Sequence, residues 1–336
     1  DDVVEIYCHR SEMGQGIRTS LPQVIADELE ADWDRIELLQ ALGDPKYGDQ
    51  NTDGSTSIRK HFDLLRTAGA SAREMLVAAA ALEWGVPASE LVARNHAVHH
   101  EASGRSAAFG DLVATAAELE VPEEVTFKDP ADYRYIGKSM DLVDGVAMTT
   151  GTAMYGTDTA LPGMLYAAIE RCPVYGGKVR SLDDAAALKV AGVRQVVKMP
   201  DGTSPPGYNP LGGVAVLANN SWSAEQGRKA LAIDWDTGLN TEYDSERYRQ
   251  QLVDTSHKDG QTVMNRGDVQ AAFEKAGRVI EAVYYAPHLS HAPMEPPAAS
   301  AMMLDDGSVE IWAATQDPQS VQGTVATMLG IDNSQV

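Results

Sequence analysis

A glycine-flanked turn ahead of an amphipathic segment constrains the fold of this chain more than any other feature. The turn consists of Glu12, Met13, Gly14, Gln15 and Gly16. Glycine has no Cβ, so two glycines around Gln15 let the backbone turn sharply and approach a ligand closely. Ser20 and Gln23 have the spacing of a capping box, which predicts a helix over 21–30. Free N–H groups in its first turn would favour an anion. The turn therefore predicts a polar, phosphorylated ligand, with an ordinary turn as the alternative.

Composition limits the kinds of partner. The chain has 336 residues, of which 43% are hydrophobic, so we expect two or three domains with real cores. Lys and Arg number 27 against 49 Asp and Glu, and the net charge of −22 argues against nucleic acid or an anionic membrane as the main partner. The apolar run at 75–82 is too short to span a bilayer, and nothing near the first residue resembles a signal peptide.

Cysteine is scarce in this sequence. Cys8 and Cys172 are the only two, and they lie far apart in the chain. Thiolates here cannot build an iron–sulfur cluster or a structural zinc site. Any electron-transfer cluster is therefore expected on a partner.

A second loop of small residues, Gly54 to Ser57, precedes a long helix that Gly85 and Pro87 end. If this helix packs beside the first one, the two loops would converge on one ligand; the alternative is two ordinary N-caps. The order before it is strand 3–7, glycine loop, helix, strand 35–40. Beyond it we expect strands with turns at 95–96 and 103–104, and a helix at 111–119. His96, His99 and His100 are predicted on a surface hairpin tip without a metal.

The rest of the chain is read as alternating strands and helices, an α+β pattern overall. Predicted strands are 164–172, 193–198, 213–218 and 278–286, with a hairpin at 299–304 and 308–313. Predicted helices are 182–189, 223–231, 268–276 and 319–329. A proline- and glycine-rich insertion is expected at 200–213, a charged linker at 236–260, and a domain boundary near 127–135.

Four segments together resemble one family. They are Glu12 to Pro22 (EMGQGIRTSLP), Leu161 to Ala167 (LPGMLYA), His291 to Pro296 (HAPMEP) and Trp312 to Gln319 (WAATQDPQ). Their joint occurrence resembles the large, molybdopterin-binding subunits of the xanthine oxidase superfamily. The Glu-Met-Gly-Gln-Gly segment comes first here, which resembles the branch of isoquinoline 1-oxidoreductase β-subunits and membrane-associated aldehyde dehydrogenases.

The resemblance implies a fold, a cofactor and site residues. It implies an α+β fold with a molybdopterin-binding α/β domain at 1–130, an α/β-hammerhead domain at 131–240 and the start of a second molybdopterin-binding domain at 241–336. The implied cofactor is molybdopterin cytosine dinucleotide with molybdenum, bound by Gly14, Gln15, Gly16, Thr19, Ser55, Thr56 and Ser57. Gln316 would be the catalytic residue that hydrogen-bonds an oxygen ligand of molybdenum. No protein residue would ligate the metal, because the pterin dithiolene holds it.

The resemblance also implies an activity and partners. The complete enzyme would oxidise N-heterocycles or aldehydes with water as the oxygen source and pass electrons to a small [2Fe–2S] subunit, with a c-type cytochrome subunit as a further candidate. The family's Gly-Gly-Phe-Gly loop and general-base glutamate are not among these residues, so we expect the remaining half of the catalytic subunit as a partner. The alternative is an inactive, cofactor-free scaffold half. By analogy the protein would be bacterial and periplasmic or membrane-associated, otherwise cytoplasmic.

Overall fold

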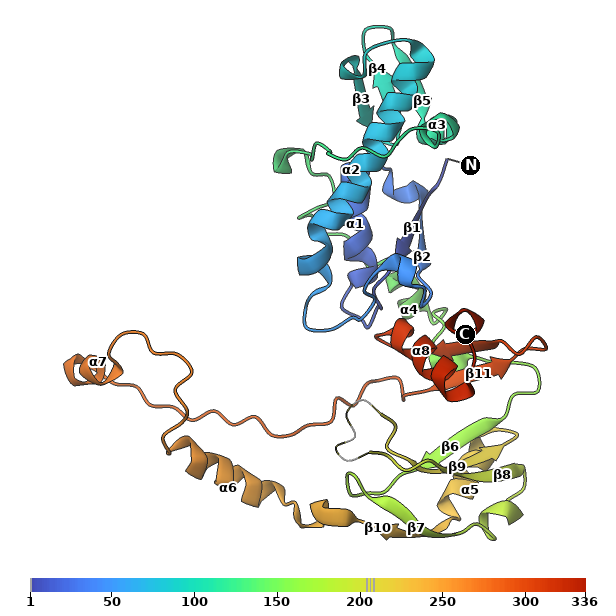
Figure 1. Ribbon diagram of the computed structural model, residues 1–336, viewed down its shortest axis with the longest axis vertical. Coiled ribbons are helices and arrows are strands. Elements are labelled where there is room, and N and C mark those ends of the chain that lie inside the picture. Colours follow the sequence, from blue (N-terminus) through green and yellow to red (C-terminus); the bar gives the residue numbers. More distant parts are fainter. Residues whose placement is uncertain (1, 204, 206, 208) are drawn as a thin grey trace. The chain divides into compact units, whose positions relative to one another are not determined.

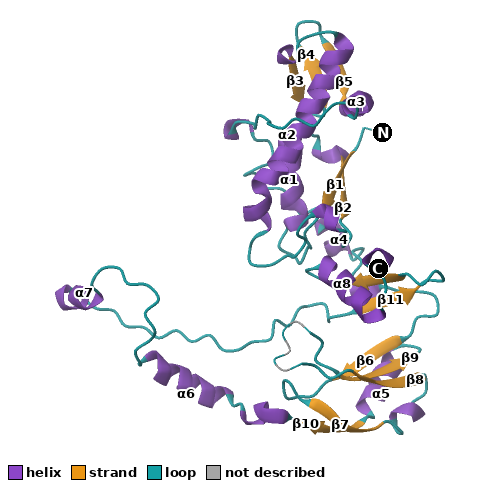
Figure 2. Cartoon of the chain, viewed as in Figure 1, coloured by secondary structure: helices purple, strands orange, loops and turns teal. Residues whose placement is uncertain are grey.

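The computed structural model describes residues 2–203, 205, 207 and 209–336 (Figure 1), and the chain forms two compact units. The first unit contains Asp1–Thr159 and Pro293–Val336, and the second contains Ala160–Ala292. Helices and strands occur in both units (Figure 2), which confirms the mixed α and β fold. The three-part division at 130 and 240 stays a prediction.

The first unit begins with a β-α-β arrangement. Strand β1 (Val4–Cys8) pairs in parallel with β2 (Ile36–Gln40), and helix α1 (Ile17–Leu29) connects them. The carboxyl ends of both strands therefore meet at one edge, where the glycine loop leads into α1. The helix begins four residues before the predicted position, because Gly16 is its N-cap with a φ of 82°, and Pro22 lies inside it.

Helix α2 (Ser57–Trp84) packs beside α1 and runs in the same direction (Figure 1). Near the start of both helices, Leu65 packs with Ile17 and Leu21. Near the end of α1, Leu29 shares a core with Leu76. The contacts follow the same order along both helices, so their N-termini lie at the same end. This is the packing that two converging loops require.

A three-stranded antiparallel sheet covers the far end of α2. It consists of β3 (Leu91–Arg94), β4 (Ala97–His100) and β5 (Arg105–Ala108), followed by α3 (Phe109–Ala116).

The predicted turn at Asn95 and His96 is present, and both residues have positive φ. The prediction of a surface loop is wrong for two of the histidines, because His96 is 2% exposed and His100 is 5% exposed. His96 accepts from the backbone N–H of Asp32 through Nδ1, and its ring packs against the Phe109 ring in a tilted arrangement. This turn is part of the core.

The segment at 126–136 is fastened to α1 by a fully buried carboxylate. Asp27 accepts hydrogen bonds from the backbone N–H groups of Arg134, Tyr135 and Ile136 and from the Lys128 ammonium. The amide and ammonium bonds hold the pKa of Asp27 below its usual range, although burial alone would raise it. Helix α4 (Gly145–Thr150) follows.

The end of the chain returns to the first unit. Strands β11 (Ala299–Met303) and β12 (Val309–Ala313) form an antiparallel hairpin, and α8 (Pro318–Leu329) ends at Gly330 in a left-handed conformation. The predicted hairpin and helix are confirmed.

The second unit contains an antiparallel sheet in the order β6 (Tyr166–Glu170), β9 (Gly213–Ala218), β8 (Val193–Met199), with α5 (Ser221–Lys229) packed on it. Strand β7 (Lys178–Asp183) pairs with β10 (Ala232–Asp236). The predicted helix at 182–189 is wrong, because its start belongs to β7 and only Ala187–Lys189 forms a 3-10 turn.

Two further helices, α6 (Ser245–Ser256) and α7 (Val269–Lys275), are capped by Asp244 and Asp268. Helix α6 lies within the predicted linker, which was therefore wrong. The predicted strand at 278–286 is also wrong: it pairs with no strand of the described chain and has no regular structure. The predicted insertion at 200–213 includes 204, 206 and 208, which lie outside the described residues.

Candidate functional site

The glycine loop follows β1 and is closed by its own carboxylate. Glu12 Oε1 accepts from the N–H groups of Gly14 at 2.7 Å and Gly16 at 3.0 Å, and Oε2 accepts from Arg18 N–H at 3.0 Å. Burial raises the pKa of Glu12, but these amide bonds outweigh it and leave the pKa below its usual range. The N–H groups expected to hold an external anion are therefore bonded to Glu12.

Gln15 bridges the same loop through its side-chain amide. Its Oε1 accepts from Met13 N–H at 2.6 Å, and its Nε2 donates to the Ser11 carbonyl at 3.0 Å. Gly14 and Gln15 are exposed, and a Cβ added at Gly14 would meet nothing within 4 Å. The tip of the loop is thus open to a ligand.

Gly16 and Thr19 face another part of the chain. A Cβ at Gly16 would lie 2.9 Å from Leu142 Cδ2, and the Thr19 hydroxyl accepts from Val143 N–H at 3.0 Å. Thr19 is only 4% exposed. The structure therefore places these two predicted site residues under the segment that leads to α4.

The second loop contains Ser55, Thr56 and Ser57. Ser55 is exposed with a φ of 55°, while Thr56 and Ser57 are buried, and Thr56 Oγ1 donates to the Asp53 carbonyl at 2.8 Å. Helix α2 has no side-chain cap and no acidic residue in its first turn. Its positive dipole end is therefore not neutralised locally.

Thr52 connects the loops and Gln316. Its hydroxyl accepts from Ser11 N–H at 2.9 Å. Its carbonyl accepts from Gln316 Nε2 at 2.7 Å, and its N–H donates to the Gln316 carbonyl at 2.9 Å. Gln319 extends this attachment through its side-chain bonds to Gln50 N–H and the Gly48 carbonyl. The structure thus brings the loop after β1, the loop before α2 and Gln316 together.

Sequence reasoning missed a buried basic cluster directly after β1. Arg10 is fully buried; its Nη2 donates to Asp49 Oδ2 at 3.2 Å and lies 3.2 Å from His61 Nε2. The rings of His9 and His61 have centroids 4.7 Å apart. The position of His9 and Arg10 at the carboxyl end of a parallel strand is the signal that could have found them.

Burial decides the charge within this cluster. Burial, reinforced by His61 and Arg10, lowers the pKa of His9 to about 4. Burial also lowers the pKa of His61. Both imidazoles are neutral near pH 7, so the Arg10 guanidinium is the cation at this position.

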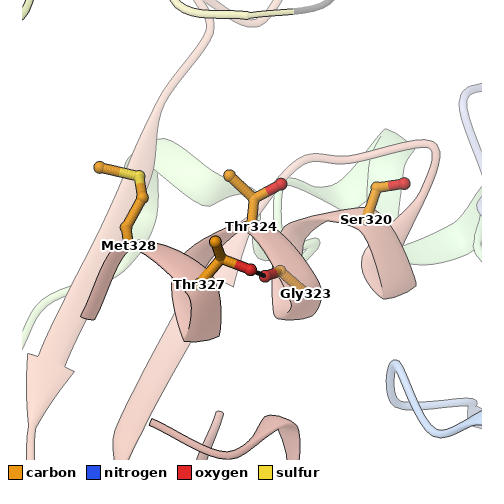
Figure 3. Close-up of a pocket in the computed structure, with 5 residues that line it drawn as sticks. All are labelled: Ser320, Gly323, Thr324, Thr327 and Met328. Carbon is orange, nitrogen blue, oxygen red and sulfur yellow. Dashed lines mark hydrogen bonds between the residues drawn. The ribbon is translucent and has the colours of Figure 1, made fainter. Parts of the chain in front are cut away.

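Hollows among the described residues of the first unit include two that differ in their lining. One of about 430 Å³ is lined by five residues of α8, namely Ser320, Gly323, Thr324, Thr327 and Met328 (Figure 3). It is lined by uncharged groups from a single helix face, and Thr327 Oγ1 donates to the Gly323 carbonyl within it. The other, of about 330 Å³, is lined by Arg18 of α1, by residues in and just before β2, and by two residues before α4, namely Trp33, Ile36, Glu37, Leu38, Val143 and Asp144. The smaller hollow, with its charged groups, suits a polar ligand better.

Comparison with known proteins identifies the family. Family models described as molybdopterin cofactor-binding domains match residues 1–160 and 253–336. Isoquinoline 1-oxidoreductase subunit beta of Brevundimonas diminuta is 33% identical over 98% of this chain and 47% of its own length. This chain belongs to the molybdopterin-binding subunits of the xanthine oxidase family. Another family member, the membrane-bound aldehyde dehydrogenase (pyrroloquinoline-quinone) of Gluconacetobacter polyoxogenes, is 33% identical over 100% of this chain and 44% of its own length.

The chain spans about half the length of these two family relatives. Among solved structures, quinoline 2-oxidoreductase from Pseudomonas putida 86 matches with 22% identity and a TM-score of 0.43, covering 57% of this chain and 28% of that one. Across the described residues, every helix is too short or too polar to cross a membrane.

Proposed function

We propose that this family member binds molybdenum-bearing molybdopterin, in its cytosine dinucleotide form, at two loops. One contains Gly14, Gln15, Gly16 and Thr19, and the other contains Ser55, Thr56 and Ser57. The observation that carries the proposal is the junction at Thr52, where hydrogen bonds join both loops to Gln316. The uncapped start of α2 and the unpartnered donors of the buried Arg10 fit a phosphorylated tail.

Each residue has a distinct role in this proposal. Gly14 leaves space for the tail because it carries no side chain, and Gln15 supplies an amide that can exchange its bond to Ser11 for one to the ligand. Gln316, held by Thr52, would orient an oxygen ligand of the metal without ligating the metal itself. When bound, the cofactor supplies two-electron oxidation chemistry with oxygen derived from water.

We propose that the whole protein oxidises N-heterocycles or aldehydes and passes electrons to a [2Fe–2S] subunit, with a c-type cytochrome as a further acceptor. The relatives support this, because their names include isoquinoline 1-oxidoreductase and aldehyde dehydrogenase. Within this chain, Cys8 is buried and its thiol is bonded to the Arg18 carbonyl, so it is not placed to hold a cluster. We propose a hammerhead domain at 131–240, between molybdopterin-binding segments at 1–130 and 241–336. By analogy with the family, we propose that the protein is bacterial and periplasmic or membrane-associated, otherwise cytoplasmic.

Metal and cofactor analysis of the purified assembly tests this function. We expect molybdenum and a pterin dinucleotide, together with dye reduction by aldehydes or N-heterocycles. An assembly with neither molybdenum nor dye reduction would support the alternative of a scaffold half. Detection of a quinone in place of molybdenum would instead support the quinone cofactor named for the Gluconacetobacter relative.

The loop assignment needs its own variant. Gln15→Ala should lower the molybdenum content of the assembly, because the amide at the loop tip is lost. Gln251→Ala, at an exposed position of α6 in the second unit, is the matched control and should leave the content unchanged. Equal molybdenum content in the two variants would show that Gln15 is not part of the cofactor site.

A further inference from the structure

The Arg10 guanidinium lacks partners that its burial demands. Arg10 is 0% exposed, yet neither Nε nor Nη1 has a hydrogen-bond partner among the described residues. A guanidinium carries five N–H donors and no acceptor, and leaving such donors unpaired away from water is costly. The nearby His9 Nε2 is buried and unpartnered as well. These atoms point to an acceptor group that the chain itself does not supply.

The cluster adjoins the start of α2. His61 Nδ1 lies 3.0 Å from the Ser57 carbonyl in the first helical turn, and His61 Nε2 lies 3.2 Å from Arg10 Nη2. Arg10 is therefore one imidazole ring away from a helix start that has no side-chain cap. A buried cation and an uncapped helix start both favour an oxyanion.

The two carboxylates near the loops are held very differently. Glu12 is fixed by three backbone N–H groups and already fills the anion position of the first loop. The Asp49 side chain is 52% exposed; its Oδ2 pairs with Arg10 at 3.2 Å and with the exposed Lys60 at 4.0 Å. Its other oxygen accepts from the neighbouring Asn51 N–H. Asp49 can therefore move away from Arg10 at much lower cost than Glu12 can leave its amides.

We propose that Arg10, with the first turn of α2, binds a diphosphate group of the cofactor tail, and that Asp49 is an exchangeable counter-ion that leaves Arg10 when the diphosphate arrives. This inference rests on the proposed function, since the cofactor tail is the source of the diphosphate. It assigns the phosphate contact to Arg10 and α2, and it removes that contact from the Gly14 and Gly16 amides.

Inorganic pyrophosphate is the probe, and isothermal titration calorimetry on the 336-residue chain is the measurement. Asp49→Asn should tighten pyrophosphate binding by about tenfold, because the competing carboxylate is gone. Asp44→Asn is the matched control: it makes the same change of charge in the same loop, where Asp44 pairs with the exposed Lys46. This control should change the affinity by less than about twofold.

Arg10→Met should abolish binding while far-ultraviolet circular dichroism stays unchanged. If Arg10→Met does not fold, the comparison of Asp49→Asn with Asp44→Asn decides. Equal affinities in those two variants, or unchanged binding by folded Arg10→Met, would overturn the proposal. Inorganic phosphate binding as tightly as pyrophosphate would indicate a single-phosphate site and overturn the diphosphate assignment.

The outcome is separable from the proposed function. Molybdenum in the assembly together with a failed pyrophosphate pattern would reject the Arg10 site alone. The expected pyrophosphate pattern in an assembly without molybdenum would retain an oxyanion site at Arg10 and reject the cofactor as its ligand.

Discussion

The Cys8 thiol donates a hydrogen bond to the main-chain carbonyl of Arg18, with 3.9 Å between sulfur and oxygen. Pro22 lies four residues after Arg18 in α1 and has no N–H to give to that carbonyl. Cys8, the last residue of β1, thus replaces the missing helical donor. A proline that would otherwise weaken α1 is accommodated by a bond from the adjacent strand.

Replacement of this thiol should destabilise the first unit. Cys8→Ala removes a buried sulfur and leaves the Arg18 carbonyl without a donor, so we expect a loss of about 1–3 kcal/mol in the free energy of unfolding. Urea denaturation measures it. Cys172→Ala, at a partly exposed site, is the control and should cost under about 1 kcal/mol. Equal losses in the two variants would contradict the role of Cys8.

The two thiols should also differ in reactivity. Burial raises the pKa of Cys8 to about 11, the dominant effect despite the opposing charge of Arg18, so Cys8 remains a protonated thiol at pH 8. A disulfide reagent at pH 8 should modify Cys172 in the native chain and both cysteines in denaturant. Rapid native modification at Cys8, located by peptide mass analysis, would show that β1 opens readily.

Two helical glycines should respond oppositely to alanine. A Cβ at Gly69 of α2 would lie 2.6 Å from the Ile25 carbonyl oxygen and 2.9 Å from Glu28 Cβ, so Gly69→Ala should push α1 and α2 apart at a cost of about 1–3 kcal/mol. A Cβ at Gly323 of α8 meets nothing within 4 Å, so Gly323→Ala should stabilise by about 0.5–1 kcal/mol. Thermal unfolding of both variants measures the pair, and the same sign for both would refute the close packing at Gly69.

His9 should make stability depend on pH. Its pKa is about 4 in the folded chain against an ordinary value of 6.5, so the unfolded chain binds more protons between these values. Stability is therefore fully present above about pH 6.5 and falls as the pH drops towards 4. Between pH 6.5 and 5, His9 should lower the free energy of unfolding by about 2 kcal/mol, and this decrease should be absent in His9→Asn. The exposed His257→Asn should keep the wild-type dependence, and an unchanged slope in His9→Asn would contradict the burial of a neutral imidazole.

Asp27 should control the attachment of segment 126–136. Asp27→Asn replaces an acceptor of three amides and an ammonium with a side chain that carries its own donors, which should cost about 2–4 kcal/mol. Hydrogen exchange should accelerate at the backbone amides of Arg134 to Ile136. Asp111→Asn is the control, because the exposed Asp111 carboxylate accepts one backbone hydrogen bond, from Ala108 N–H. Protection equal to that of the wild type at these amides would mean that other contacts hold the segment.

Elements with local signals could be predicted from the sequence. The hairpin of β11 and β12 turns at Asp305 to Gly307, and α8 ends at Gly330, so neighbouring residues specify both. The start of α1 could not be predicted in this way. Ser20, expected as its cap, instead donates from its hydroxyl to the Gly16 carbonyl inside the first turn. Strand β7 was missed because its partner β10 lies about fifty residues later in the chain.

For the candidate site too, the features with a local sequence signal could be predicted and the others could not. The positions of both loops followed from local glycine and hydroxyl patterns, and helices α1 and α2 lie side by side as those patterns require. The occupation of the loop amides by Glu12 depends on the local backbone geometry of the loop, which residue types alone do not specify. The burial of Arg10 depends on contacts with Asp49 and His61, which lie 39 and 51 positions away. Such contacts leave no local pattern in the sequence.

The attachment of Gln316 to Thr52 also has a consequence for the order of synthesis. The two residues are separated by 264 positions, and the whole second unit lies between them. At a translation rate of about 5–20 residues per second, Thr52 leaves the ribosome roughly 13–50 s before Gln316. Throughout that interval the carbonyl of Thr52 has no Gln316 side chain to bind. The hydrogen bonds between Thr52 and Gln316 therefore form only after the second unit has been synthesised.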